Sequence, residues 1–136
     1  LKVHDSVFVP LAKWAMLLAG NYRCVTKDGA RTIQEAVHGD VEASRSVYNF
    51  VRDLCIKLGA APDDLVPFEK YAAAAQGLSR PSSAARALNN GVPNIERADK
   101  LVQLIAASKG LRNAAIDAQV AVVDERLAQN RKKAAA

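Results

Sequence analysis

The chain has 136 residues, of which 50% are hydrophobic and 24% charged, and its formal net charge is +5. This composition is that of a single globular domain over residues 1–136. No apolar run is long enough to span a membrane, and residues 1–10 lack a signal-peptide pattern. The basic residues are scattered, cluster only at Arg131-Lys132-Lys133 and are not interleaved with aromatics, so we do not expect nucleic acid as a partner.

The first predicted helix runs from about Phe8 to Gly20. Pro10 suits its first turn, where a missing N–H costs nothing. Apolar residues recur at helical spacing along it, and Lys13 lies beside this apolar stripe. A loop is expected from Cys24 to Gly29, because Lys27-Asp28-Gly29 is typical of a turn.

The next two helices have clear start and stop signals. Thr32 and Glu35 form a capping box, in which each side chain satisfies a free backbone donor, and that short helix is expected to stop at Gly39. Asp40 starts the most regular helix, which Gly59 ends. Its apolar stripe consists of Val47, Phe50, Val51, Leu54, Cys55 and Leu58.

Two shorter helices are predicted after Gly59. Asp63-Asp64 is expected to cap the first of them, with Pro67 tolerated in its first turn and Gly77 as its end. The second starts at Pro81 and runs to about Leu88.

Asn89-Asn90-Gly91 then breaks the chain, and Pro93 or Asn94 opens the following helix. We expect its buried face to contain Ile95, Ala98, Leu101, Val102 and Ile105. Gly110 closes it, and the last helix begins near Asn113 with a stripe of Ile116, Val120, Val123 and Leu127. The sequence therefore predicts an all-α compact bundle of six or seven helices.

Several kinds of site are not expected. Glycines are single and widely spaced, so neither a P-loop nor a dinucleotide fingerprint is present. His4 and His38 are isolated and no Cys-x-x-Cys exists, so no metal site is predicted. Cys24 and Cys55 lie in apolar surroundings, which predicts buried free thiols in a reducing cytoplasm.

Five polar residues are candidates for a site, each with a simpler structural interpretation. Lys13 either acts as an acid or point charge, or extends its stem to water. Asn21 shares its face if the helix continues past Gly20, and otherwise caps that helix. Ser82 and Ser83 either offer an anion site in a first helical turn or are ordinary N-terminal serines. Asn94 is most simply an N-cap.

The order of these motifs resembles the C-terminal helical domain of the ketopantoate reductase (2-dehydropantoate 2-reductase) family of NADP-dependent oxidoreductases. The similarity extends over most of the chain. It rests on Leu11-Ala12-Lys13 through Asn21, Leu58-Gly59-Ala60, Arg80-Pro81-Ser82-Ser83, Asn89-Asn90-Gly91, and the helix expected over 94–110.

The resemblance implies roles for the candidate residues. Lys13 matches the lysine that donates a proton or hydrogen bond to the substrate carbonyl. The family's asparagines four and eight residues later correspond to Leu17 and Asn21. Ser82-Ser83 matches a substrate-contacting pair, and Asn94 stands where a glutamate is expected. The departures at Leu17 and Asn94 predict a related reductase with a changed substrate pocket.

The resemblance also implies a fold like the 6-phosphogluconate dehydrogenase C-terminal domain and a cytoplasmic enzyme that reduces a 2-keto acid to a 2-hydroxy acid. NADP would be bound mainly by an N-terminal Rossmann domain absent from this chain, so the chain alone should be inactive. A homodimer is plausible through Ala72–Ala75, whose small side chains permit close helix packing. The alternative interpretation is a free-standing helical module that binds a protein or nucleic acid.

Overall fold

The computed structural model describes residues 11–135, and the predicted all-α class is confirmed there. Counting the first helix, of which residues 11–16 are described, this range holds seven α-helices and no strand beyond one isolated bridge. The predicted start at Phe8–Pro10 lies outside the described residues. The other elements are η1 (a π-helix, Leu17–Asn21), η2 (Tyr22–Cys24), α2 (Ile33–His38), α3 (Val41–Lys57), η3 (Pro62–Asp64), α4 (Phe68–Ala75), α5 (Ser83–Asn89), α6 (Ala98–Ser108) and α7 (Ala114–Ala135).

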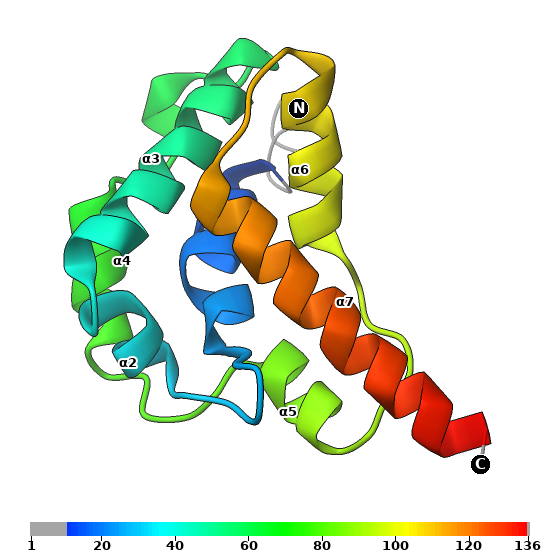
Figure 1. Cartoon of the computed structure of the whole chain (residues 1–136). Coiled ribbons are helices and arrows are strands. Elements are labelled where there is room, and N and C mark those ends of the chain that lie inside the picture. Colours follow the sequence, from blue (N-terminus) through cyan, green and yellow to red (C-terminus); the bar gives the residue numbers. More distant parts are fainter. Residues whose placement is uncertain (1–10, 136) are drawn as a thin grey trace, which may run out of the picture.

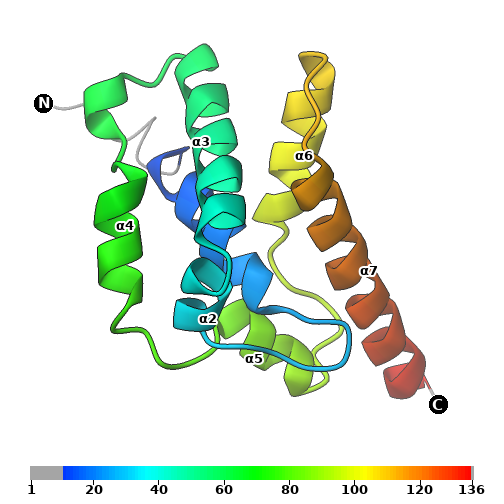
Figure 2. The same ribbon diagram turned by 60° about the vertical axis from the view of Figure 1, so that its left-hand side comes forward.

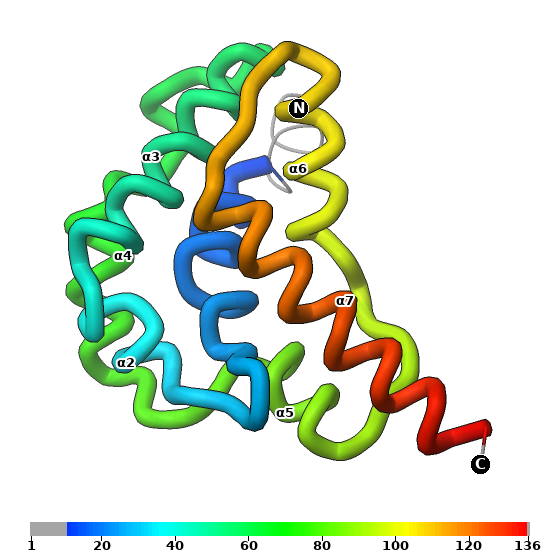
Figure 3. The backbone as a smooth tube through the Cα atoms, viewed as in Figure 1, coloured from blue at the N-terminus to red at the C-terminus, as the bar shows by residue number. Residues whose placement is uncertain are grey.

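The first helix and η1 lie at the centre of the bundle (Figure 1). On one side are α3 and α4, and on the other the antiparallel pair α6 and α7, a division that remains clear after rotation (Figure 2). The short helices α2 and α5 lie at the lower end of the bundle as it is seen in Figure 1. Between α5 and α6 the chain runs beside α7 (Figure 3). Among residues 11–135, no helix is long and apolar enough to cross a membrane.

Most predicted helix ends are confirmed. Thr32 Oγ1 accepts from the Glu35 N–H and Glu35 Oε1 accepts from the Thr32 N–H, both at 3.0 Å, which completes the capping box. Asp40 caps α3 through its side chain. Gly59 and Gly110 follow α3 and α6 with positive φ angles of 111° and 74°, which favour glycine.

The predicted end of the first helix at Gly20 is wrong. The helix widens into the π-turn of η1 and continues as the 3₁₀ turn of η2 to Cys24. Gly20 is buried, and a Cβ at this position would lie 1.8 Å from Tyr71 Oη of α4. Gly20 therefore permits close packing of η1 against α4 instead of ending a helix.

The predicted start of α4 is also wrong. Asp63 and Asp64 belong to the separate turn η3, and Pro67 immediately precedes α4 instead of lying in its first turn. The residues between them are held away from helix by packing, because Leu65 is buried and Tyr48 Oη donates to the Val66 carbonyl at 2.6 Å.

The alanines of α4 divide between the core and the surface. Ala72 and Ala75 are buried in the core, whereas Ala73 and Ala74 are exposed. Part of the segment that the sequence offers for a homodimer contact is thus used inside the domain.

The helix expected from Pro93 or Asn94 begins later, at Ala98, so that prediction is wrong. Its buried face is also shifted: Leu101 is 47% exposed, whereas Asp99 is fully buried. Ala98 and Val102 are buried as predicted. The contacts that keep residues 92–97 out of the helix form part of the candidate site described below.

Both cysteines are free and buried, as predicted. Burial raises the pKa of the Cys24 thiol and raises that of Cys55 to about 11. Because the thiolate is the reactive form, both side chains are inert in the folded domain.

Candidate functional site

A cleft of about 310 Å³ lies between η1, α5 and the linker that joins α5 to α6. Asn21, Ser83 and Asn94 line it, so three of the five candidate residues meet although they come from distant segments. The remaining lining residues are apolar or small except Glu96, and comprise Leu17, Tyr22, Ala84, Ala87, Val92, Ile95 and Ala98. Apolar walls with a few convergent polar groups are the usual form of a small-molecule site.

The π-turn brings Asn21 toward the cleft. In a uniform α-helix, the eight residues from Lys13 to Asn21 would rotate the side chain by about 80°. A π-turn takes one extra residue per turn, which reduces this offset and returns Asn21 toward the stripe that carries Lys13 and Leu17. Single π-turns inside α-helices are frequent at functional sites.

Lys13 does not line the cleft. It is exposed on the first helix, one turn before Leu17, which does line the cleft. Lys13 is therefore not among the residues that form the walls of the cleft.

Ser82 has a structural role. It is buried, its Oγ accepts from the Ala85 N–H at 3.2 Å as the N-cap of α5, and the same hydroxyl donates to the Asn21 carbonyl at 2.6 Å. The hydroxyl thus fixes α5 to the end of η1, which places the neighbouring Ser83 at the cleft.

A second hollow of about 350 Å³ adjoins the cleft through shared residues. Asn21 and Ser83 line both, and Arg80 and Arg86 add two exposed guanidinium groups to the second one, which we call the basic depression. Two cations beside a serine and an asparagine can bind a carboxylate, since Arg matches the geometry of that group.

Tyr22 holds the linker in its extended form. Its hydroxyl donates to the Glu96 carbonyl at 2.5 Å and accepts from the Ala98 N–H at 3.0 Å. Burial raises the pKa of Tyr22, so the hydroxyl keeps its proton. These two bonds explain why α6 begins only at Ala98. The periodicity of the sequence carries no signal for them.

An ion-pair network fixes the first turn of α6 against α7. Arg97 donates from Nε and Nη2 to the fully buried Asp99 at 3.0 and 3.1 Å, and from Nη1 to Asp124 at 2.6 Å. Although burial opposes it, the hydrogen bonds and charge of Arg97 lower the pKa of Asp124. The one sequence signal for this network was an acid, Asp99, at a position where α6 is otherwise apolar.

Asn94 is held by α7 and does not cap a helix. Arg131 donates from Nη2 to Asn94 Oδ1 at 3.1 Å and from Nε to the Pro93 carbonyl at 2.9 Å. The side chain is exposed at the edge of the cleft, so its amide nitrogen can donate to a ligand.

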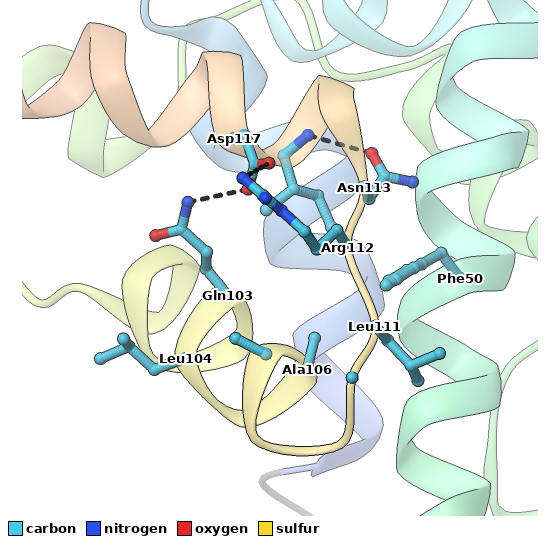
Figure 4. Close-up of a pocket in the computed structure, with 11 residues that line it drawn as sticks. Phe50, Gln103, Leu104, Ala106, Leu111, Arg112, Asn113 and Asp117 are labelled. Atoms are coloured by element: carbon cyan, nitrogen blue, oxygen red, sulfur yellow. Dashed lines mark hydrogen bonds and ion pairs between the residues drawn. The ribbon is translucent and has the colours of Figure 1, made fainter.

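A separate apolar pocket of about 350 Å³ lies between α3, α6 and the start of α7 (Figure 4). Phe50, Leu104 and Leu111 contribute to its lining, and Asp117 accepts a hydrogen bond from Gln103 at its rim. It contains none of the five candidate residues, and its polar side chains already have partners within the fold. Arg112 Nη2 lies 3.6 Å from Asp117 Oδ2, and Asn113 Oδ1 accepts from the Ile116 N–H at 3.0 Å.

The described residues include no group of three or more His, Cys, Asp or Glu side chains that could hold a metal ion. No family model, no curated protein and no solved structure matches the chain. The cleft and the basic depression are thus the features from which a function can be inferred.

Proposed function

We propose that this chain is the substrate-binding domain of an NADP-dependent oxidoreductase of the ketopantoate reductase type, which reduces a 2-keto acid to a 2-hydroxy acid. The observation that carries the proposal is the meeting of Asn21, Ser83 and Asn94 at one cleft. The order of their motifs along the chain makes these residues candidates, and that order does not require them to be neighbours in space.

The two adjoining hollows suit the two ends of such a substrate. The carboxylate would bind in the basic depression between Arg80, Arg86 and the Ser83 hydroxyl. The organic part would lie in the cleft against Leu17 and neighbouring apolar side chains. Asn21, which lines both hollows, would then contact the substrate near its keto group.

Lys13 would act from the rim of the cleft. Reduction of a ketone places negative charge on the carbonyl oxygen, and a fixed cation near that oxygen stabilises the transition state. A lysine can also supply the proton that the alkoxide takes up.

The lining of the cleft does not fit the cofactor itself. The lining of the cleft contains Glu96 and no cation, whereas a dinucleotide carries phosphates that need backbone N–H groups or basic side chains. In this proposal NADP is bound mainly by an N-terminal Rossmann domain, and the helical chain contributes the contacts to the keto acid.

Binding of the substrate class can be tested on this chain alone. Titration with ketopantoate, followed by NMR of side-chain amides, should shift the signals of Asn21 and Asn94. The exposed Asn49 of α3 is the matched control and should not move. Equal shifts at all three amides, or none, would contradict the assignment of the cleft.

The role of Lys13 requires the full-length enzyme. Lys13→Ala should lower turnover by about a hundredfold or more, the size typical of general-acid catalysis, with a much smaller change in substrate binding. Lys57→Ala, which removes another exposed lysine at the end of α3, is the control and should leave turnover unchanged. Normal turnover in Lys13→Ala would remove Lys13 from the mechanism.

A further inference from the structure

A polar pocket of about 330 Å³ lies beside the C-terminal half of α7 and shares no lining residue with the cleft. Lys27 reaches it from the turn before α2, while Arg126 and Lys133 come from α7. Asn89 and Asp28 also line it. The fold thus brings Lys27 together with two cations of α7 that are far from it in the sequence, and the pocket contains one acid, Asp28.

The guanidinium of Arg126 is the unusual group in this pocket. The residue is only 8% exposed, yet each of its hydrogen bonds goes to a neutral oxygen. Nη1 donates to the carbonyls of Thr26 and Gly29, and Nη2 donates to Asn89 Oδ1, each at 2.7 Å. Within residues 11–135 no carboxylate forms an ion pair with it. Buried charges are normally paired, so its positive charge lacks the usual compensation.

These three hydrogen bonds orient Arg126 and leave it with further donors. A guanidinium has five N–H groups in a fixed fork, and the contacts to Thr26, Gly29 and Asn89 use three of them. Because Asn89 accepts through Oδ1, its amide nitrogen remains a donor. Lys27 and Lys133 form no ion pair with a described residue, so their ammonium groups are available as well.

We propose that this pocket, hereafter the α7 pocket, binds the phosphate group of a small phosphomonoester, with Arg126 at its base and Lys27 and Lys133 at its rim. The net formal charge of its lining, three cations and Asp28, complements the charge of about −1.5 to −2 that a phosphomonoester carries at neutral pH. Several converging donors also suit a group with three acceptor oxygens. This site is independent of the keto acid cleft and does not require the proposed reductase activity.

Titration of the whole chain with inorganic phosphate, and then with glycerol 3-phosphate, tests the proposal. NMR should show saturable shifts of the Arg126 side-chain N–H and the Asn89 amide. Lys27→Gln with Lys133→Gln should weaken binding by about tenfold or more, because two charge-assisted contacts are lost. Asp28→Asn should tighten binding, since it removes the one negative charge of the lining.

Lys132→Gln is the matched control, because Lys132 is the exposed neighbour of Lys133 and does not line the pocket. It removes the same charge and should change affinity less than twofold. No saturable shift with either phosphate compound would overturn the proposal, as would an equal loss in Lys132→Gln. A single-stranded oligonucleotide could instead bind more tightly than glycerol 3-phosphate and lose affinity equally in Lys132→Gln and in the double variant of Lys27 and Lys133. That result would overturn the proposal and indicate electrostatic binding of nucleic acid by the tail of α7. These rim variants leave the hydrogen bonds of Arg126 to the fold intact.

Discussion

The domain has two hydrophobic clusters that are held together differently. The large cluster joins the first helix and η1 to α3, α4 and α6, with Leu18, Val51 and Leu54 among its fully buried side chains. The small cluster joins η2, α5 and α7 around Cys24 and Leu127. The large cluster is dense in aliphatic and aromatic side chains, and Tyr48 packs between Phe68 and Tyr71 within it.

Around the small cluster, polar side chains join distant segments by hydrogen bonds to the backbone. Tyr22 and Ser82 bind backbone groups of segments far away in the sequence, and so do Arg126 and Asn130 of α7. Both proposed binding sites lie beside this cluster. The comparison indicates that apolar burial in the large cluster sets global stability, whereas hydrogen bonds around the small cluster set the geometry of the sites.

The largest expected effect comes from a cavity in the large cluster. Leu54→Ala should lower the free energy of unfolding by about 2–5 kcal/mol, the usual range when a buried leucine is truncated to alanine. Chemical denaturation measures this loss. Leu104→Ala is the control, because Leu104 is 60% exposed and its truncation should cost less than about 0.5 kcal/mol. Equal losses would show that the large cluster does not carry the stability assigned to it.

The next effect concerns the contact between η1 and α4. In Gly20→Ala the added Cβ would lie 1.8 Å from Tyr71 Oη, so the protein should lose about 1–3 kcal/mol, as is usual for overpacking. Tyr71→Phe removes the clashing oxygen and should recover part of that loss in the double variant. Gly77→Ala, whose Cβ would meet nothing closer than 3.8 Å, is the control. Additive losses in the double variant would exclude this clash as the cause.

A smaller and more local effect is expected at the small cluster. Tyr22→Phe leaves the Glu96 carbonyl and the Ala98 N–H without their partner, which should cost about 1–3 kcal/mol. Hydrogen exchange should accelerate over 94–98. Tyr48→Phe, which removes one bond to Val66 in the large cluster, is the matched control and should leave exchange at 94–98 unchanged. Unchanged exchange at 94–98 in Tyr22→Phe would show that the linker is fixed by other contacts.

The sequence was sufficient for the elements whose ends are set locally. The capping box at Thr32, the N-cap at Asp40 and the glycines after α3 and α6 each satisfy nearby backbone groups, so their signals are short-range. The errors fall where distant contacts override local preference. Tyr71 requires Gly20 inside a helix, and Tyr22 keeps the linker extended up to Ala98.

The candidate site shows the same division. Residue types and their order made Asn21, Ser83 and Asn94 candidates, and the three line one cleft. They could not separate Ser83 from Ser82, because the hydrogen bond of Ser82 to the Asn21 carbonyl exists only after η1 and α5 pack. The charge of the α7 pocket was equally hidden, since Lys27 lies far from α7 in the sequence. The basic residues are scattered along the sequence, but folding brings Lys27, Arg126 and Lys133 together in this pocket.

The smallest perturbation uses the two cysteines as natural probes of the two clusters. Cys55 is fully buried in the large cluster and Cys24 in the small one, and burial raises the pKa of both thiols. Both should therefore resist alkylation until the structure around them opens. If fewer apolar contacts make the small cluster open by itself, Cys24 should react first and with a weaker dependence on denaturant than Cys55. Single-cysteine variants, Cys24→Ala and Cys55→Ala, assign the rates by mass spectrometry. Identical rates and denaturant slopes would mean that the two clusters open together as one cooperative unit, which would contradict the division drawn between them.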